Sequence, residues 1–275
     1  MTHFSEPAPS RSPNLLALDI DGTILDHDGA LSERVREAVA GVVARGAHVV
    51  LATGRSLHAT LPVLDSLDLR HGWAVCSNGS VTLRLDPTLD AGYEIADQVT
   101  FDPTTVLTLL REHLPTALYA VEEAGVGYRL TAPFPEGELG GDQLFVSFEG
   151  LLHRRCARVI VRAPDQTSEH FAELVRRVGL NGVNFAVGWT AWLDLSPEGV
   201  SKASALEAVR ERLGVARART VAVGDGRNDL EMLAWAGRSC AMGQAPPEVR
   251  AAAHQVLGTV DDDGLVPLLD ALPSR

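Results

Sequence analysis

The sequence predicts an α/β protein that carries an inserted second domain of α+β character. Short apolar strands alternate with helices in the first part of the chain, and the same alternating pattern returns after Pro197. Such alternation predicts a parallel sheet with helices on both faces. Between these parts, strand-like segments are separated by Gly, Pro and acidic turns, which is typical of α+β structure. We therefore predict a disordered tail at residues 1–13, a first core segment at 14–84, an inserted domain at 85–194 and a second core segment at 195–275.

The first core segment contains three predicted strands. Leu15–Asp19 is an apolar run that ends at a carboxylate, and a helix with valines on one face follows it. Ser32 fits the N-cap of this helix and Gly46 fits its end. His48–Ala52 and Trp73–Cys76 are the next two strands, and a second amphipathic helix lies between them. This order of strands and helices is the repeating unit of a parallel sheet.

The inserted segment and the second core segment have different patterns. In the insert, helices are predicted at Pro103–His113, with Asp102 as N-cap, and at Ser168–Val178. The second core segment has a helix at Ser201–Leu213 and an apolar strand at Thr220–Val223. The strand-like segments of the insert are Tyr119–Glu122, Tyr128–Leu130, Arg158–Arg162 and Trp192–Leu195. The side chains of Arg84, Arg129, Arg158 and Arg162 could reach a substrate, but solvated faces are the default expectation for them.

Composition and charge exclude several classes of protein. The formal charge is −12 and no basic tract is present, which argues against broad binding of nucleic acids or anionic membranes. No apolar run approaches the roughly 20 residues of a membrane-spanning helix. The three cysteines form no CxxC pair, so a reducing cytoplasm fits best, and Cys76 and Cys240 are expected to be small buried hydrophobic residues. A small phosphorylated metabolite is compatible with the charge, and no protein partner is indicated.

Four polar clusters follow predicted strands or open a predicted helix. In open α/β sheets, ligands bind beyond the carboxyl ends of the strands, so the clusters lie where a binding site is expected. The clusters are Asp19-Ile20-Asp21-Gly22-Thr23, Thr53-Gly54-Arg55, Lys202, and Gly224-Asp225-Gly226-Arg227-Asn228-Asp229.

The residue types of these clusters suit phosphoryl transfer. Asp19 and Asp21 can have different roles, because one carboxylate can attack phosphorus while the other transfers the leaving-group proton. Carboxylate and phosphate oxygens form the hard-oxygen ligand set that Mg²⁺ prefers, and Asp225 would complete that set. Lys202 supplies a compact cation, and Thr53 together with backbone N–H groups can donate hydrogen bonds to phosphate oxygens.

Each cluster taken alone also has a structural explanation. A DxDG motif is often an Asx turn, and Thr53-Gly54-Arg55 is more often a strand-to-helix turn. Lys202 would usually be a solvated lysine, and Asp229 is a natural N-cap for the helix that begins at Leu230. The joint occurrence of all four clusters, in this order and at strand ends, favours the functional interpretation.

The four clusters resemble the motifs of the haloacid dehalogenase (HAD) superfamily. The matches, in order, are DIDGT at residues 19–23, Thr53 within LATGR, Lys202 within SPEGVSKASAL, and GDGRND at residues 224–229. Ser77-Asn78-Gly79 and AMGQAP at residues 241–246 are similar to the Cof-like branch, although that branch commonly has Asn at the position of Gln244. The resemblance implies a Rossmann-like parallel sheet core with an inserted α+β cap of the large type IIB.

The resemblance also implies a role for each motif residue. Asp19 would be the nucleophile and a Mg²⁺ ligand, Asp21 would be the general acid/base and a ligand through its carbonyl, and Asp225 would be the remaining protein ligand. The phosphate would be contacted by Ile20, Thr53, Gly54, Lys202 and Asn228. The site would be supported by Asp229, Gly22 and Thr23.

These residues predict a Mg²⁺-dependent phosphohydrolase that cleaves a small phosphomonoester, such as a sugar phosphate or a vitamin-related phosphate, through an aspartyl-phosphate intermediate. One alternative is phosphoryl transfer between sugar hydroxyls, as in sugar phosphomutases, which would require the cap to exclude water. Another is a non-catalytic regulator that binds a phosphorylated ligand without turnover. The presence of all four motifs argues against the regulator.

Overall fold

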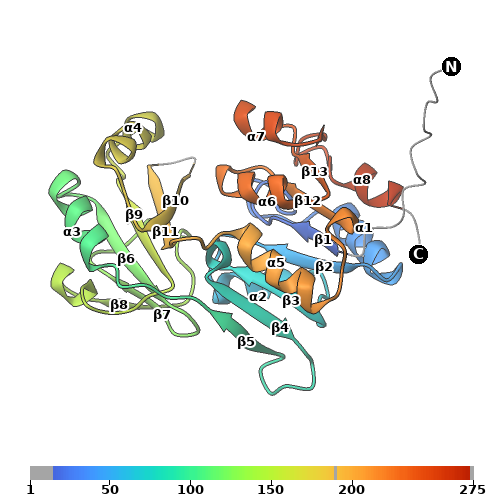
Figure 1. Cartoon of the computed structure of the whole chain (residues 1–275), viewed down its shortest axis with the longest axis horizontal. Coiled ribbons are helices and arrows are strands. Elements are labelled where there is room, and N and C mark those ends of the chain that lie inside the picture. The colour runs from blue at the N-terminus through green and yellow to red at the C-terminus, as the bar shows by residue number, and fades with distance from the viewer. Residues whose placement is uncertain (1–14, 189–190, 273–275) are drawn as a thin grey trace.

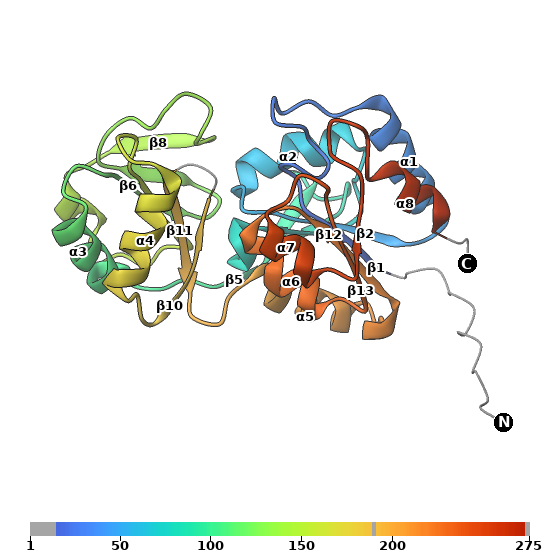
Figure 2. The ribbon, with the colours of Figure 1, turned by 90° about the horizontal axis from the view of Figure 1, so that it is seen from above.

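The computed structural model describes residues 15–188 and 191–272, and the predicted tail at residues 1–13 lies outside them. Two lobes are visible in Figure 1, each built on its own sheet. The chain leaves the larger sheet after β5 (Tyr93–Gln98) and returns to it after β11 (Trp192–Pro197). In the view of Figure 2 the two lobes stand side by side. We call them the large-sheet lobe and the small-sheet lobe, the latter comprising β6 to β11 with helices α3 and α4.

The large sheet confirms the predicted parallel core. Its strand order is β14-β13-β12-β1-β2-β3-β4-β5, and the pairs from β14 to β3 are parallel. The two pairs that link β3, β4 and β5 are antiparallel. The other strands are β1 (Leu15–Leu18), β2 (His48–Ala52), β3 (Gly72–Cys76), β4 (Val81–Leu85), β12 (Thr220–Gly224), β13 (Arg238–Ala241) and β14 (Gln255–Val256).

Helices cover both faces of the large sheet because its strands are apolar on both sides. Leu16 and Leu18 of β1 pack with α1, α2 and α8, whereas Leu15 and Ala17 pack with α5, α6 and α7. The prediction that Ser32 caps the first helix is confirmed, since its side chain accepts a hydrogen bond from the third helical residue. The helices are α1 (Glu33–Ala44), α2 (Leu57–Ser66), α5 (Lys202–Arg212), α6 (Leu230–Trp235), α7 (Pro247–Ala252) and α8 (Val266–Ala271), with short 3₁₀ turns at Ser77–Gly79, Arg217–Arg219 and Arg227–Asp229.

The small sheet has the order β10-β11-β9-β6-β7-β8 and is antiparallel except between β7 and β8. Helices α3 (Thr104–His113) and α4 (Ser168–Val178) cover one face, where Leu107 and Phe171 pack against residues such as Val159 and Val161. The opposite face carries Tyr128 and residues at the alternate strand positions. The other elements are β6 (Leu118–Glu123), β7 (Gly127–Leu130), β8 (Asp142–Phe145), β9 (Arg158–Arg162), β10 (Val183–Val187) and a 3₁₀ turn at Phe148–Leu151.

Three details differ from the sequence-based expectations. The predicted boundary after residue 84 falls inside the large sheet, since β5 pairs with β4 in that sheet although the sequence pattern assigns it to the insert. The predicted boundary after residue 194 falls inside β11, which pairs with β9 and β10 in the small sheet. The helix predicted from Pro103 begins at Thr104, because Pro103 is its cap residue; Asp102 still accepts a hydrogen bond from the Thr104 N–H.

Within the described residues, no helix is both long and apolar enough to cross a membrane.

Candidate active site

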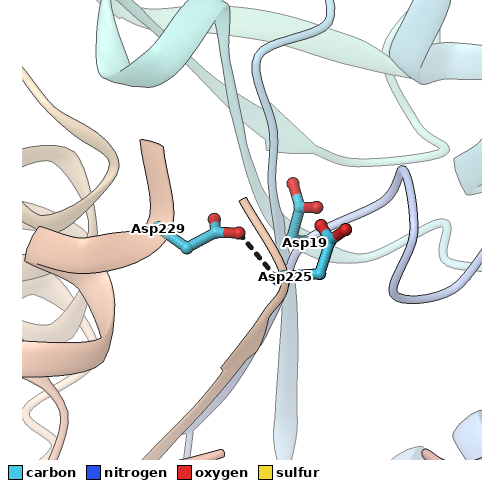
Figure 3. A group of neighbouring side chains, drawn as sticks. All are labelled: Asp19, Asp225 and Asp229. Atoms are coloured by element: carbon cyan, nitrogen blue, oxygen red, sulfur yellow. Dashed lines mark hydrogen bonds between the residues drawn. The ribbon is translucent and has the colours of Figure 1, made fainter. Parts of the chain in front are cut away.

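The carboxyl ends of neighbouring parallel strands bring together three aspartates from distant parts of the sequence. Asp19 follows β1 directly and Asp225 follows β12, and these strands pair in register. The Asp19 N–H donates to the Val223 carbonyl at 3.0 Å, which extends the pairing to the aspartate itself. Oxygen atoms of Asp19, Asp225 and Asp229 all lie within 4.8 Å of one another (Figure 3). The sequence prediction that these segments meet at one rim of the sheet is therefore confirmed.

Lys202 is buried between two of these carboxylates. It is the first residue of α5, whose start is fixed by Ser201 and Ser204, each side chain accepting from the backbone N–H of the other residue. Its Nζ donates to Asp19 Oδ1 at 2.5 Å and to Asp229 Oδ1 at 2.6 Å, and its side chain is 0% exposed. The alternative of a solvated lysine is therefore wrong, because a buried ammonium requires such partners.

Asp229 connects Lys202 to the loop that carries Asp225. Its Oδ2 accepts hydrogen bonds from the backbone N–H groups of Asp225 and Gly226, both at 2.9 Å. A side chain at Gly224 would place its Cβ 2.7 Å from the Cβ of Asp229, so this close approach requires glycine. Asp229 occupies the N-cap position of α6, as predicted, but makes no side-chain cap hydrogen bond to that helix. Its carboxylate instead organises the loop and Lys202.

Burial and neighbouring charges shift the pKa values of the charged groups at this site. Burial raises the pKa of Asp19 well above its usual value, and Asp229 raises it further. Burial and the same neighbour raise the pKa of Asp225 to about 7. Burial alone would lower the pKa of Lys202, but Asp19 and Asp229 outweigh it and raise that pKa. Three buried carboxylates around one ammonium form an oxygen-rich, negatively charged site, which suits a hard divalent cation.

The hydrogen bonds of the three carboxylates distinguish ligands from supporting residues. Both oxygens of Asp229 accept hydrogen bonds, whereas Asp19 uses Oδ1 to accept from Lys202. Asp19 and Asp225 therefore have the carboxylate oxygens that could bind a cation, and the resemblance adds the backbone carbonyl of Asp21 to this ligand set. Asp229 fits a supporting role better than that of a ligand.

A tight turn places Asp21 and Thr23 around Asp19. The Ile20 carbonyl accepts the N–H groups of Thr23, Ile24 and Leu25, which closes the turn. Ile20 and Thr23 are fully buried, and Thr23 Oγ1 has no hydrogen-bond partner among the described residues. Gly22 adopts φ +75°, and a Cβ at this position would lie 2.7 Å from Asp225 Cγ.

We expect Gly22→Ala to lower the free energy of unfolding by about 2–4 kcal/mol, because the new methyl group meets Asp225 and the backbone is left-handed. Gly29→Ala is a matched control, since Gly29 has φ +80° and no atom lies within 4 Å of the position that a methyl group would take there. Only the backbone penalty of about 1–2 kcal/mol then applies. Urea denaturation measures both losses. Equal losses in the two variants would show that the contact with Asp225 is unimportant.

Asp21 lies at the mouth of the site, beside Arg55. The Arg55 guanidinium donates to both carboxylate oxygens of Asp21, at 2.9 Å from Nε to Oδ2 and 2.5 Å from Nη2 to Oδ1. The Asp21 side chain is 58% exposed, in contrast to the buried Asp19. It is therefore oriented by Arg55 and accessible from the mouth of the site.

Thr53, Gly54 and Asn228 meet on the other side of the site. Thr53 is buried, and its Oγ1 accepts the Arg55 N–H at 3.0 Å, which leaves its own hydroxyl proton to donate. Asn228 Nδ2 donates to Asn78 Oδ1 at 3.0 Å, and a Cβ on Gly54 would lie 3.3 Å from that same oxygen. All the predicted site residues are thus gathered at one end of the large sheet, and Asn78 joins them.

A cavity of about 400 Å³ connects this cluster to the small-sheet lobe. The large-sheet lobe contributes Asp19, Asp21, Arg55 and Asp225, and the small-sheet lobe contributes Tyr128, Glu138, Arg158, Trp192 and Asp194. The expectation of a solvated Arg158 is wrong, since this residue is 4% exposed. The sequence signal for Tyr128, Arg158, Trp192 and Asp194 is their position at alternate places on the strands, opposite the face that packs against α3 and α4. Glu138 lies between β7 and β8 and has no such signal.

The cysteines are not candidates for the chemistry. All three are free and buried, as expected for Cys76 and Cys240. Burial raises the pKa of the Cys76 and Cys156 thiols to about 12. A thiol with such a pKa is hardly ionised at neutral pH and is a poor nucleophile.

Comparison with known proteins gives consistent matches along nearly the whole chain. The family model for haloacid dehalogenase-like hydrolases matches residues 16–269. The Bacillus subtilis protein YkrA is 30% identical over 265 residues, which cover 91% of this chain and 94% of the relative. The 5-amino-6-(5-phospho-D-ribitylamino)uracil phosphatase YcsE of Bacillus subtilis is 26% identical over 253 residues, covering 91% and 92%. The structure of the HAD subclass IIB sugar phosphatase BT4131 superposes with a TM-score of 0.78 at 21% identity, covering 94% and 98%.

Proposed function

The chain belongs to the haloacid dehalogenase-like hydrolase family, and from this premise we propose that it is a Mg²⁺-dependent phosphatase of small phosphomonoesters that acts through an aspartyl-phosphate intermediate. The observation that carries the proposal is the buried group of Asp19, Asp225 and Lys202 at the carboxyl edge of the large sheet. A nucleophile, an oxygen-rich cation site and a fixed ammonium thus lie within reach of one phosphoryl group.

Asp19 is the proposed nucleophile. Lys202 donates to Oδ1 of this carboxylate, and one carboxylate oxygen attacks phosphorus while the other remains available to the cation. A bond forms between the attacking Asp19 oxygen and phosphorus while the bond between phosphorus and the leaving-group oxygen breaks. Asp21 gives a proton to that leaving oxygen. In the second step, Asp21 takes a proton from water, the water oxygen attacks phosphorus, and inorganic phosphate leaves as the Asp19 carboxylate is regenerated.

The remaining residues stabilise the negative charge on the phosphoryl oxygens. A Mg²⁺ ion held by Asp19, Asp225 and the Asp21 carbonyl would supply Lewis-acid stabilisation of the phosphoryl oxygens. Lys202 keeps a positive charge beside the nucleophile, and the Thr53 hydroxyl and Asn228 amide are placed to donate hydrogen bonds to phosphate oxygens. Asp229 fixes Lys202 and the loop at Asp225 in this arrangement.

We expect a screen of phosphorylated metabolites to identify substrates whose phosphate release requires Mg²⁺. The screen should include sugar phosphates and a phosphoribityl compound, because BT4131 is named as a sugar phosphatase and YcsE acts on such a compound according to its name. Excess EDTA should lower phosphate release by at least about 100-fold, and added Mg²⁺ should restore it. Turnover that persists unchanged in EDTA would contradict the metal-dependent mechanism.

Metal binding can also be measured without turnover. A cation that binds only the folded protein raises its unfolding temperature, so Mg²⁺ should raise the Tm of the wild-type protein. Asp225→Asn removes one proposed ligand and should abolish most of that increase. An equal Mg²⁺ effect on both proteins would place the ion elsewhere.

A further inference from the structure

A buried cluster of polar side chains joins the two lobes beside the proposed catalytic site. The cluster consists of Glu122 on β6, Tyr128 on β7, Arg158 on β9 and Asp194 on β11. These residues lie on the face of the small sheet that α3 and α4 leave uncovered. Glu122 and Arg158 are 2% and 4% exposed. Charged groups are buried this deeply only when they are paired, so their partners indicate their role.

Arg158 is at the centre of the cluster. Its Nε donates to Glu122 at 2.8 Å, its Nη2 donates to the Tyr128 hydroxyl at 2.9 Å, and its Nη1 donates to Asp194 at 3.1 Å. Nη1 also donates to the backbone carbonyl of Gly54 in the large-sheet lobe. Four of the five guanidinium N–H groups are therefore used by the protein. An arginine engaged in this way is poorly suited to bind a substrate phosphate, although it lines the cavity.

The contacts with the large-sheet lobe fall on two loops of the proposed phosphate site. Gly54 lies between Thr53 and Arg55. The second contact is from the Ser77 hydroxyl to Glu122 Oε1 at 2.7 Å, and Ser77 precedes Asn78. The two loops are themselves linked, since the Asn78 N–H donates to the Thr53 carbonyl at 3.0 Å.

The loop at Ser77 is held by contacts from both lobes, and within the large-sheet lobe the Ser77 N–H donates to the Arg55 carbonyl at 2.8 Å. Ser77 and Asn78 have φ values of 51° and 53°, in the left-handed region that residues other than glycine rarely occupy. Such a conformation persists only where surrounding contacts fix it. On this loop, the Ser77 hydroxyl is fixed by Glu122 from the other lobe, and the Asn78 side chain accepts from Asn228.

We infer that Arg158 and Glu122 are positioning residues, which hold the Gly54 carbonyl and the Ser77 hydroxyl so that the loops bearing Thr53 and Asn78 adopt the geometry required to stabilise the phosphoryl group during its transfer. The inference rests on the proposed function for the identity of the bound group. Separation of the two lobes breaks both contacts at once. The phosphate site is therefore completed by docking of the small-sheet lobe, through residues that do not themselves touch the phosphate.

Hydrogen exchange measured by mass spectrometry tests this inference without any turnover. Arg158→Gln and Ser77→Ala each remove one contact between the lobes. We expect peptides that contain Gly54 and Asn78 to exchange about tenfold faster in both variants, because local opening becomes easier. Arg129→Gln is the matched control, since Arg129 pairs with Glu123 within the small-sheet lobe and does not line the cavity. It should leave exchange in those two peptides unchanged.

Kinetics distinguish positioning from direct binding. With a generic phosphate ester and Mg²⁺, Arg158→Gln and Ser77→Ala should lower kcat by about 10- to 100-fold and change KM by less than about threefold, because the loops are misplaced while no substrate contact is lost. Arg158→Lys, which keeps the charge but has fewer donors, should recover only part of kcat. A rise in KM with unchanged kcat would instead assign Arg158 to substrate binding.

The outcomes separate this inference from the proposed function. Unchanged exchange at Gly54 and Asn78 in Ser77→Ala and in folded Arg158 variants overturns the inference, even if the wild-type protein hydrolyses esters. Faster exchange together with an inactive wild-type protein would support positioning while contradicting the phosphatase proposal. If Arg158→Gln does not fold, Ser77→Ala and Arg158→Lys decide the question by the same criteria.

Discussion

Asp19→Asn should lower phosphate release by at least about 10⁴-fold while the protein remains folded. The amide has nearly the shape of the carboxylate but carries no charge, so its oxygen is a very poor nucleophile. The variant should still fold, because Lys202 keeps its contact with Asp229 and because burial of the Asp19 carboxylate is itself unfavourable. Measurement requires a substrate from the metabolite screen and a phosphate assay in saturating Mg²⁺.

The aspartyl-phosphate intermediate gives a second measurement of the same prediction. Rapid acid quenching of the wild-type protein with a labelled ester should trap phosphate on the peptide that contains Asp19, whereas Asp19→Asn should trap none. Asp65→Asn is a control for the chemical change alone, since the Asp65 side chain is 73% exposed on α2. Wild-type activity in Asp19→Asn would refute the nucleophile assignment.

The large sheet and its site could be predicted because their signals are local in the sequence. Apolar strands that end at a polar residue identify both the strand and the edge where its side chain lies, and parallel pairing then brings Asp19 and Asp225 together. Ser32 and Ser201 mark helix starts through the same local chemistry.

The polar face of the small sheet could not be predicted in the same way. Strand alternation places Arg158 and Ile160 on one face and Val159 and Val161 on the other, but it does not reveal which faces are covered by another part of the chain. Burial of Arg158 depends on the docking of Gly54 from the other lobe, which is separated from it by 104 positions. A solvated arginine is the reasonable default until that contact is known.

Gln244 shows a different limit of sequence reasoning. It departs from the residue common in the Cof-like branch, and this departure predicts an effect on substrate or metal detail. In the structure its Nε2 donates to the Gly22 carbonyl at 2.5 Å, and its Oε1 accepts the Val260 N–H at 3.1 Å. Gln244 therefore links two segments of the chain, namely the turn that contains Asp21 and Gly22 and the distant loop at Val260. Its side chain also hydrogen-bonds Asp225, so Gln244 contacts both the turn and a proposed metal ligand.

Lys202→Met should cause large losses of both activity and stability. Lys202 is the only lysine among the 24 Lys and Arg residues of the chain, and it is buried against Asp19 and Asp229. Methionine has a similar length but no charge, so two carboxylates would remain buried without their counter-ion. We expect the free energy of unfolding to fall by about 3–5 kcal/mol and phosphate release to fall by at least about 10³-fold.

Two further variants test separately the charge and shape of Lys202 and its contacts with Asp19 and Asp229. Lys202→Arg keeps the charge, but the planar guanidinium is larger than the ammonium, so activity should remain low in a fully buried position. The double variant Lys202→Met with Asp229→Asn removes one uncompensated carboxylate and should regain about 1–3 kcal/mol of stability in urea denaturation without regaining turnover. Recovery of turnover in the double variant would show that Lys202 serves only to neutralise Asp229. Recovery of stability alone would show that the uncompensated charge of Asp229 causes part of the stability loss in Lys202→Met.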